Sequence, residues 1–240
     1  MPDMPRPLPP AILFDLDDTI LSFATLADAA WKHVVDSYVP QLPGVTADAL
    51  LPVVLERRDW YWSDPERHRR GRLGIDDAYG EIVRQAFGLI GVAAPEVAGR
   101  MAEEYGVVRG KGIRPFPGAV DTLTALGDRG VKLALVTNGD RKTQRGKIDD
   151  HDLERFFDCI VVEGEFGIGK PNDEVYVYAM ETLGVGPNET WMVGDNFEWE
   201  VVAPKRLGLT AIWVDSRAEG LPASPSVMPD RIIRSITELF

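Results

Sequence analysis

Short runs of apolar residues recur along the chain and predict buried strands. The runs stand at Ala11–Phe14, Lys132–Val136, Cys159–Val162, Thr190–Val193 and Thr210–Val214. A short apolar run bounded by turn residues is typical of a strand that is buried on both faces, as in a parallel sheet.

Between the later runs the apolar residues return every three or four positions, which predicts helices. A polar helix is expected around Arg141–Asp149, and helices with this periodicity are expected at Ala119–Asp128, Pro171–Leu183 and Glu198–Leu207. Pro204 lies inside the last of them, so we expect a kink or an early stop there. Alternating strands and helices of this length indicate a doubly wound parallel sheet, that is, a Rossmann-like α/β core.

A different pattern separates the first strand from the others. Helical periodicity covers Leu21–Tyr38, Thr46–Trp62, Ile75–Ile90 and Pro95–Val108, with a polar, basic passage over Ser63–Arg72 and no convincing strand. We therefore expect a core domain of residues 11–20 and 115–240 and an inserted all-helical cap domain of residues 21–114. Residues 1–10 contain five prolines and are expected to be a flexible lead-in, and the tail after Asp215 to be a loop with an amphipathic end at Arg231–Phe240.

Charge and composition narrow the class of protein. The 38 acidic residues outnumber the 26 basic ones and give a formal charge of −12, which argues against nucleic acid or an anionic membrane as the main partner. The single cysteine, Cys159, excludes an internal disulfide framework and is expected to be a core residue. No signal peptide and no window of about 18 apolar residues is found, so we expect a soluble cytoplasmic protein.

The first strand runs directly into Asp15-Leu16-Asp17-Asp18-Thr19. Carboxylates packed this closely repel one another, and a bound cation is the simplest way to lower that cost. The alternative is a strand that ends in an ordinary acidic turn. Asp18 and Thr19 are interpreted as residues that hydrogen-bond this turn.

Other polar residues are expected to join Asp15 at the carboxyl edge of the sheet, where open α/β sheets place their ligands. They are Thr137, Lys170 and Asp195, each of which follows a predicted strand. A carboxylate can attack phosphorus, a second one can move protons, and carboxylate oxygens suit Mg²⁺. A hydroxyl, turn amides and a lysine can hold the oxygens that gain charge.

Together these segments resemble the four motifs of the haloacid dehalogenase superfamily of phosphohydrolases. The matching segments are Asp15-Leu16-Asp17-Asp18-Thr19, Leu135-Val136-Thr137-Asn138-Gly139, Gly169-Lys170-Pro171 and Met192-Val193-Gly194-Asp195-Asn196. The resemblance covers essentially all of residues 11–240, and a helical cap between the first and second motifs matches a common subclass.

The resemblance implies a role for each matched residue. Asp15 would be the nucleophile and a Mg²⁺ ligand, and Asp17 the general acid and then base, with its backbone carbonyl on the metal. Thr137 and the Asn138 backbone would bind the phosphoryl oxygens. Lys170 would orient Asp15, and Asp195 would complete the metal site.

One position departs from the family pattern. Many members carry a second Asp five residues after the first in the fourth motif, where this chain has Glu200. This longer side chain could act through water or cap the helix, and Glu198 and Asn196 are further candidates near the metal.

The resemblance implies a phosphatase acting on a small phosphorylated metabolite, as a monomer or a homodimer. Three alternatives remain: a 2-haloacid dehalogenase, a phosphomutase of the same superfamily, and a binding protein without activity. Asp17 speaks against the first, because the family's dehalogenases lack that second Asp. Gly194 speaks against the second, because phosphomutases often carry Glu there, and the presence of both Asp15 and Asp17 speaks against the third.

The predicted cap contains Trp60-Tyr61-Trp62 followed by a basic run that includes Arg69 and Arg70. One hypothesis is a substrate-binding rim in which aromatic rings stack on an organic group and an arginine meets a second anion. The favoured interpretation is core aromatics beside a solvated face. Asp215 matches no motif and is expected to be a cap or loop residue, and the three histidines, His33, His68 and His151, lack metal-ligand spacing.

Overall fold

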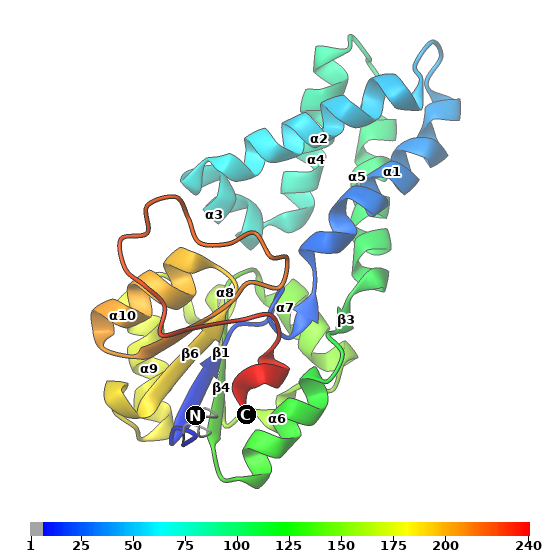
Figure 1. Cartoon of the computed structure of the whole chain (residues 1–240). Helices are drawn as coiled ribbons and strands as arrows, with labels where there is room; N and C mark the ends of the chain where they lie inside the picture. Colours follow the sequence, from blue (N-terminus) through cyan, green and yellow to red (C-terminus); the bar gives the residue numbers. More distant parts are fainter. Residues whose placement is uncertain (1–6) are drawn as a thin grey trace. The chain divides into compact units, whose positions relative to one another are not determined.

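The computed structural model describes residues 7–240, and over this range the chain forms two compact units (Figure 1). The core unit runs up to Ser22 and resumes at Arg114, and the cap unit is Phe23–Ile113. Most of the expected flexible lead-in, residues 1–6, lies outside the described residues.

In the described chain the core unit is built on a six-stranded parallel sheet with the strand order β5-β4-β1-β6-β7-β8. The strands are β1 (Ala11–Phe14), β4 (Lys132–Thr137), β5 (Cys159–Val162), β6 (Thr190–Gly194), β7 (Thr210–Val214) and β8 (Arg231–Ile233). β1 pairs with β4 on one side and with β6 on the other, so the chain's first strand lies in the middle of the sheet. The predicted doubly wound α/β fold is confirmed.

Helices and short helical turns alternate with these strands. They are α6 (Ala119–Asp128), α7 (Arg141–Asp150), η3 (Glu154–Phe156), α8 (Glu163–Phe166), α9 (Asp173–Leu183), η4 (Pro187–Glu189), η5 (Glu198–Val202), α10 (Ala203–Leu207) and η6 (Ile236–Leu239). Ala11 and Leu13 of β1 pack into one apolar cluster with Val175 and Ala179 of α9. Because side chains alternate along a strand, Ile12 and Phe14 face the opposite side of the sheet.

Three details differ from the sequence prediction. α9 begins at Asp173, two residues after Pro171. The amphipathic end contains the edge strand β8, which was not predicted. Only Ile233 of its three residues is buried, so the segment lacks the apolar run that marks a central strand. At Pro204 the helix does not stop early: a π-helical turn, η5, runs directly into α10, of which Pro204 is the second residue.

The cap unit is helical, as predicted. Its elements are η1 (Ala24–Leu26), α1 (Ala27–Tyr38), η2 (Val39–Gln41), α2 (Ala47–Ser63), α3 (Pro65–Leu73), α4 (Ile75–Leu89) and α5 (Pro95–Gly112). The basic passage expected between helices is itself helix α3. Asp64 caps it by accepting a hydrogen bond from the Arg67 amide at 2.8 Å, and Pro65 fits the first turn.

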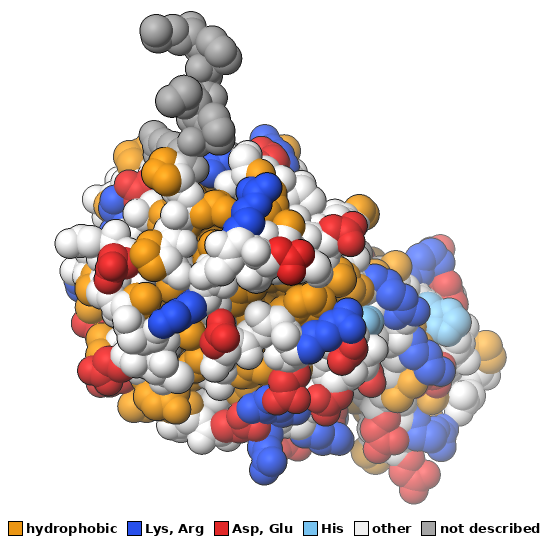
Figure 2. All heavy atoms as spheres, turned by 90° about the horizontal axis from the view of Figure 1, so that it is seen from below, with side chains coloured by type: hydrophobic (Ala, Val, Ile, Leu, Met, Phe, Trp, Pro, Cys, Tyr) orange, Lys and Arg blue, Asp and Glu red, His pale blue; other side chains and the backbone are white. Residues whose placement is uncertain are grey.

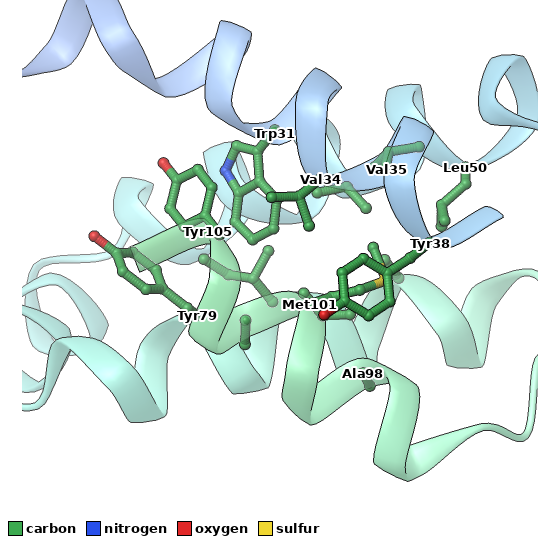
Figure 3. Close-up of a cluster of buried hydrophobic side chains, with 14 of the residues drawn as sticks. Trp31, Val34, Val35, Tyr38, Leu50, Tyr79, Ala98, Met101 and Tyr105 are labelled. Carbon is green, nitrogen blue, oxygen red and sulfur yellow. The ribbon is translucent and has the colours of Figure 1, made fainter. Parts of the chain in front are cut away.

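An aromatic cluster forms the centre of the cap unit (Figure 3). The Trp31 and Tyr105 rings stack with centroids 3.6 Å apart, and Tyr79 meets Tyr105 edge-on at 4.6 Å. Trp31 is fully buried and Tyr105 nearly so. Aromatic side chains of this size dominate the burial energy of a small helical unit.

Two short strands stand where the chain leaves the core unit and where it returns. β2 (Leu21–Ser22) pairs antiparallel with β3 (Arg114–Pro115), and the Ser22 hydroxyl donates to the Arg114 carbonyl at 3.1 Å. The two ends of the inserted segment are therefore held side by side.

The surface carries both signs of charge. On the face that Figure 2 shows, acidic and basic side chains are interspersed between apolar ones. Among the described residues, no helix combines the length and the apolar character that crossing a membrane requires.

Candidate active site

The turn after β1 presents the acidic residues at the carboxyl edge of the sheet. The Asp15 amide donates to the Val193 carbonyl at 2.9 Å, which extends the pairing of β1 with β6 by one residue. Asp18 then adopts a left-handed conformation with φ of 58°, which Asp tolerates better than most residues, and its amide donates to the Leu21 carbonyl. The role expected for Thr19 is wrong, because its buried hydroxyl has no hydrogen-bond partner among the described residues.

Lys170 lies at the centre of the site and is fully buried. Its ammonium donates to Asp15 Oδ1 and to Glu200 Oε1, both at 2.7 Å. Burial alone would lower the pKa of Lys170, but the charges of Asp15 and Glu200 outweigh it and raise this pKa above its ordinary value. Lys170 is therefore a permanent cation at neutral pH.

Asn138 holds the backbone of Lys170 at two points. The Asn138 side chain accepts from the Lys170 amide and donates to the Lys170 carbonyl, each at 2.8 Å. The segment after β4 thus positions the lysine whose ammonium reaches Asp15 after β1, although 155 residues separate the two in sequence.

Gly194 makes room for Glu200. A Cβ atom at Gly194 would lie 2.1 Å from Glu200 Cγ and 2.9 Å from Asp15 Cβ, so only glycine fits at the end of β6. Glu200 is fully buried with one oxygen on Lys170, and its other oxygen, Oε2, has no hydrogen-bond partner within the described chain. Sequence reasoning missed this contact with Lys170.

Negative charge is in excess around these residues. Burial, followed by the charges of Asp15, Glu200 and Asp18, raises the pKa of Asp195 to about 9. Burial likewise raises the pKa of Glu200 to about 7, against the opposing effect of Lys170, and raises the pKa of Asp15. Such carboxylates gain from any added positive charge nearby.

The donors present suit a magnesium ion. Within residues 7–240 no three Asp, Glu, His or Cys side chains converge closely enough to hold a metal by themselves. Mg²⁺ does not need such a cage, because it binds through one or two carboxylates and keeps waters and substrate oxygens as its other ligands. Asp15 and Asp195 with the Asp17 carbonyl could supply donors of that kind, and the raised pKa of Asp195 and the unpartnered Glu200 oxygen are consistent with a cation nearby.

A second polar cluster surrounds Asp17 and Thr137. Lys147 Nζ lies 2.8 and 2.7 Å from the two carboxylate oxygens of Asp17. Gln144 Nε2 donates to the Thr137 hydroxyl at 2.5 Å and to Asp17 Oδ2 at 3.3 Å. Asp140 caps the start of α7 by accepting from the Thr143 amide at 2.9 Å.

Comparison with known proteins identifies the family to which this chain belongs. The sequence pattern of the haloacid dehalogenase-like hydrolases matches residues 9–208. This chain belongs to that family.

Several relatives from this family are phosphatases. The phosphoserine phosphatase of Thermus thermophilus is 34% identical, over 95% of this chain and 97% of that protein. The glyceraldehyde 3-phosphate phosphatase of Methanocaldococcus jannaschii is 27% identical, over 84% of this chain and 82% of that protein. The magnesium-bound structure of the hydrolase YfnB from Bacillus subtilis has the same fold, with a TM-score of 0.73 at 24% identity over 97% of both chains.

The structure brings most of the residues predicted for this hydrolase together in the core unit. Lys170 contacts Asp15 directly, Gln144 links Thr137 to Asp17, and Asp15 is among the charges that raise the pKa of Asp195. The other two candidates serve the helix that follows β6: the Asn196 side chain accepts from the amides of Glu198 and Trp199, each at 3.1 Å, and Glu198 itself is exposed.

Sequence reasoning overlooked Gln144 and Lys147. The segment Arg141–Asp150 is strongly polar, so its helical periodicity carried no sign of a buried face. The usable signal was the spacing of three residues between Gln144 and Lys147, which places both on the same face of a helix that begins just after Thr137.

In the cap unit, the aromatic segment belongs to the helical core. Tyr61 is buried, and Trp60 and Trp62 pack against the same apolar cluster. The Arg67 guanidinium lies 3.9 Å from the centroid of the Trp60 ring and donates to the Trp60 carbonyl at 2.7 Å. The favoured interpretation of these aromatics is supported.

The predicted substrate-binding arginines and two other residues can now be placed. Arg69 and Arg70 are exposed on α3, and Arg70 donates to Glu81 at 3.3 Å, so their contact with substrate stays a prediction. Cys159 is buried and Asp215 accepts from the amides of Glu219 and Gly220, which confirms a core residue and a loop residue.

Proposed function

We propose that this hydrolase is a Mg²⁺-dependent phosphatase that cleaves a small phosphate monoester through an aspartyl-phosphate intermediate. One observation carries the proposal. Two carboxylates on the same turn have different cationic partners: Asp15 pairs with the buried ammonium of Lys170 at 2.7 Å, and Asp17 pairs with Lys147. Different surroundings suit two carboxylates to different tasks.

Asp15 is proposed as the nucleophile. Lys170 keeps one carboxylate oxygen fixed and leaves the other for attack on phosphorus. Thr137, at the end of β4, and the backbone of Asn138 are proposed to bind the phosphoryl oxygens, with Lys170 offsetting their charge.

Asp17 is proposed to move the protons. It donates one to the leaving oxygen when the ester bond breaks and later takes one from the water that attacks the phosphoaspartate. Asp17 lies two residues after the proposed nucleophile, on the same turn.

A Mg²⁺ ion held by Asp15, Asp195 and the Asp17 carbonyl would neutralise charge on the transferring phosphoryl group. Glu200 contributes indirectly in this proposal, by fixing the ammonium of Lys170 at 2.7 Å. Its assignment as a direct metal ligand is not part of the proposal.

The proposed substrate is a small phosphorylated metabolite. The names of the phosphatase relatives, which act on phosphoserine and on glyceraldehyde 3-phosphate, support this size and class. Arg69 and Arg70 of the cap unit are proposed to contact a second anionic group of the substrate.

The test is the hydrolysis of 4-nitrophenyl phosphate by the purified protein. We expect turnover with Mg²⁺, loss of turnover with EDTA, recovery when Mg²⁺ is restored, and a fall of about four orders of magnitude or more in Asp15→Asn. The proposal would be refuted by turnover that does not depend on Mg²⁺ or by an Asp15→Asn variant as active as wild type. Halide release from a 2-haloacid without metal would favour the dehalogenase alternative.

A further inference from the structure

Lys147 and Gln144 of α7 join two residues that the proposed reaction uses for different purposes. Lys147 Nζ contacts both carboxylate oxygens of Asp17, at 2.8 and 2.7 Å. Gln144 Nε2 bridges Asp17 Oδ2 at 3.3 Å and the Thr137 hydroxyl at 2.5 Å. The family motifs give neither residue a role.

Burial makes this arrangement persistent. The side chain of Lys147 is 6% exposed, whereas that of Asp17 is 23% exposed. Burying an ammonium is costly unless it is paired, so the contact with Asp17 stabilises Lys147 in this position. Asp17 keeps an open side, through which a leaving group or a water molecule can reach it.

Three hydrogen bonds from two neighbouring side chains fix the plane of the carboxylate as well as its position. Gln144 and Lys147 lie three residues apart, on one face of a helix that Asp140 caps. Each oxygen of Asp17 therefore has at least one donor from α7, and these donors fix the orientation of the carboxyl group.

We propose that Lys147 and Gln144 are positioning residues that hold Asp17 in line for proton transfer and tie it to the phosphoryl-binding residue Thr137. The inference rests on the phosphatase function proposed above. In the first step Asp15 forms a bond to phosphorus as the ester P–O bond breaks, and the leaving oxygen keeps the electron pair and takes the proton of Asp17. In the second step water attacks phosphorus, Asp17 takes its proton, and the bond between Asp15 and phosphorus breaks, which yields phosphate, the free Asp15 carboxylate and the protonated form of Asp17.

The choice of leaving group separates this positioning role from a purely structural one. A nitrophenolate leaves without help from an acid, whereas an alkoxide needs a proton. A misplaced acid therefore slows cleavage of benzyl phosphate far more than cleavage of 4-nitrophenyl phosphate. The loss of an ion pair that merely supports the fold slows both equally.

The experiment compares kcat/KM for these two substrates, because kcat/KM reports the steps up to the first P–O cleavage. The variants are Lys147→Met and Gln144→Leu. The control is Arg145→Met on the same helix, whose guanidinium pairs with Glu165 at 2.8 Å. For Lys147→Met we expect a loss of about 100-fold with benzyl phosphate and of about threefold or less with 4-nitrophenyl phosphate.

Two further readouts complete the expected result. Gln144→Leu keeps the ion pair and should show the same difference between substrates with a loss of about tenfold, while Arg145→Met should match wild type on both. Asp17 also activates the water that hydrolyses the phosphoaspartate, so a misplaced Asp17 slows this second step. With 4-nitrophenyl phosphate, Lys147→Met should therefore release one nitrophenolate per active site in a burst that precedes a slower steady state.

Each outcome decides a separate point. Wild-type protein that hydrolyses neither substrate with Mg²⁺ refutes the proposed function itself. Active wild type with equal losses on both substrates, or with no loss in the variants, refutes the positioning role alone. Should circular dichroism show that Lys147→Met is unfolded, Gln144→Leu carries the same test, and equal losses there overturn the inference.

Discussion

In the core unit, the side chains buried around Asp15 include charged ones, and Lys170 and Glu200 are fully enclosed. In the cap unit, the buried side chains are apolar or aromatic, with Trp31 and Tyr105 at the centre. Every buried polar or charged side chain of the described chain other than tyrosine and tryptophan lies in the core unit. Buried ion pairs therefore add to apolar packing in the core unit, whereas apolar and aromatic packing forms the centre of the cap unit.

This difference between the units predicts how well each unit tolerates amino-acid substitutions. A buried charge needs its partner in place, so the core tolerates few substitutions near Asp15. The cap unit keeps its arginines on or near the surface, and exposed residues such as Arg69 can be replaced without a cost in folding.

Among the variants that test this comparison, Lys170→Met should have the largest effect, because it leaves Asp15 and Glu200 without their shared cation. Removing one partner of a buried pair costs about 3–5 kcal/mol. We expect a lower Tm and a fall of about 10³-fold in kcat/KM for 4-nitrophenyl phosphate. Lys205→Met, which removes a partly exposed pair with Asp230, is the matched control. A variant at Lys170 that kept about half its activity or more would show that the buried charges are not essential.

Trp31→Ala should destabilise the cap unit by about 3–5 kcal/mol, since it opens a cavity beside Tyr105. Hydrogen exchange measured by mass spectrometry should show lost protection across Phe23–Ile113 and much less change in the core unit. Trp31→Phe keeps most of the ring and should lose less. Equal loss of protection in both units would contradict the claim that Trp31 stabilises mainly the cap unit.

Arg69→Ala and Arg70→Ala should each raise KM for the best substrate by about tenfold while kcat and Tm stay close to wild type, because an exposed arginine contributes binding rather than folding. Arg100→Ala, an exposed position on α5 that bonds Gln41, is the control. Unchanged kinetics in both variants would remove the cap arginines from the proposed binding site.

Asp215→Asn should give the smallest effect. Burial opposes ionisation of Asp215, but amides of Gly220 and Glu219 and the Arg234 guanidinium outweigh it and lower its pKa. A lowered folded-state pKa means that the ionised group stabilises the fold above its unfolded pKa of 3.8 and that this stabilisation is lost as pH falls through the folded pKa. The variant should lose about 1 kcal/mol at pH 7 by urea unfolding, and the difference should shrink below pH 3.8. A difference independent of pH would contradict this account.

The strands and the residues that follow them could be predicted because a parallel sheet converts sequence order into spatial order. Apolar runs marked β1, β4 and β6, and the carboxyl ends of neighbouring strands must meet, so Asp15, Thr137 and Asp195 were predicted to converge without knowledge of any contact. Lys170, in the loop that follows the strand Cys159–Val162, was predicted to reach the same edge.

The features that could not be predicted are contacts made by residues without a recognisable hydrophobic or motif pattern. Lys147 reads as one more polar residue in a polar helix, and only its contacts at 2.8 and 2.7 Å set it apart. Glu200 was considered for water or for a helix cap, whereas its position on Lys170 follows from the missing side chain at Gly194. β8 was missed for a similar reason, since an edge strand with one buried residue lacks the apolar run of a central strand.

The pairing of β2 with β3 has a consequence for how such a chain can be rebuilt. Leu21 lies opposite Pro115 and Ser22 opposite Arg114. The inserted segment therefore connects two paired antiparallel strands, as the loop of a β-hairpin does. The length of that loop matters little to chain entropy, since each doubling costs only about 0.6 kcal/mol. The segment Phe23–Ile113 is thus an exchangeable insert: a foreign helical segment grafted between Ser22 and Arg114 should leave the sheet intact.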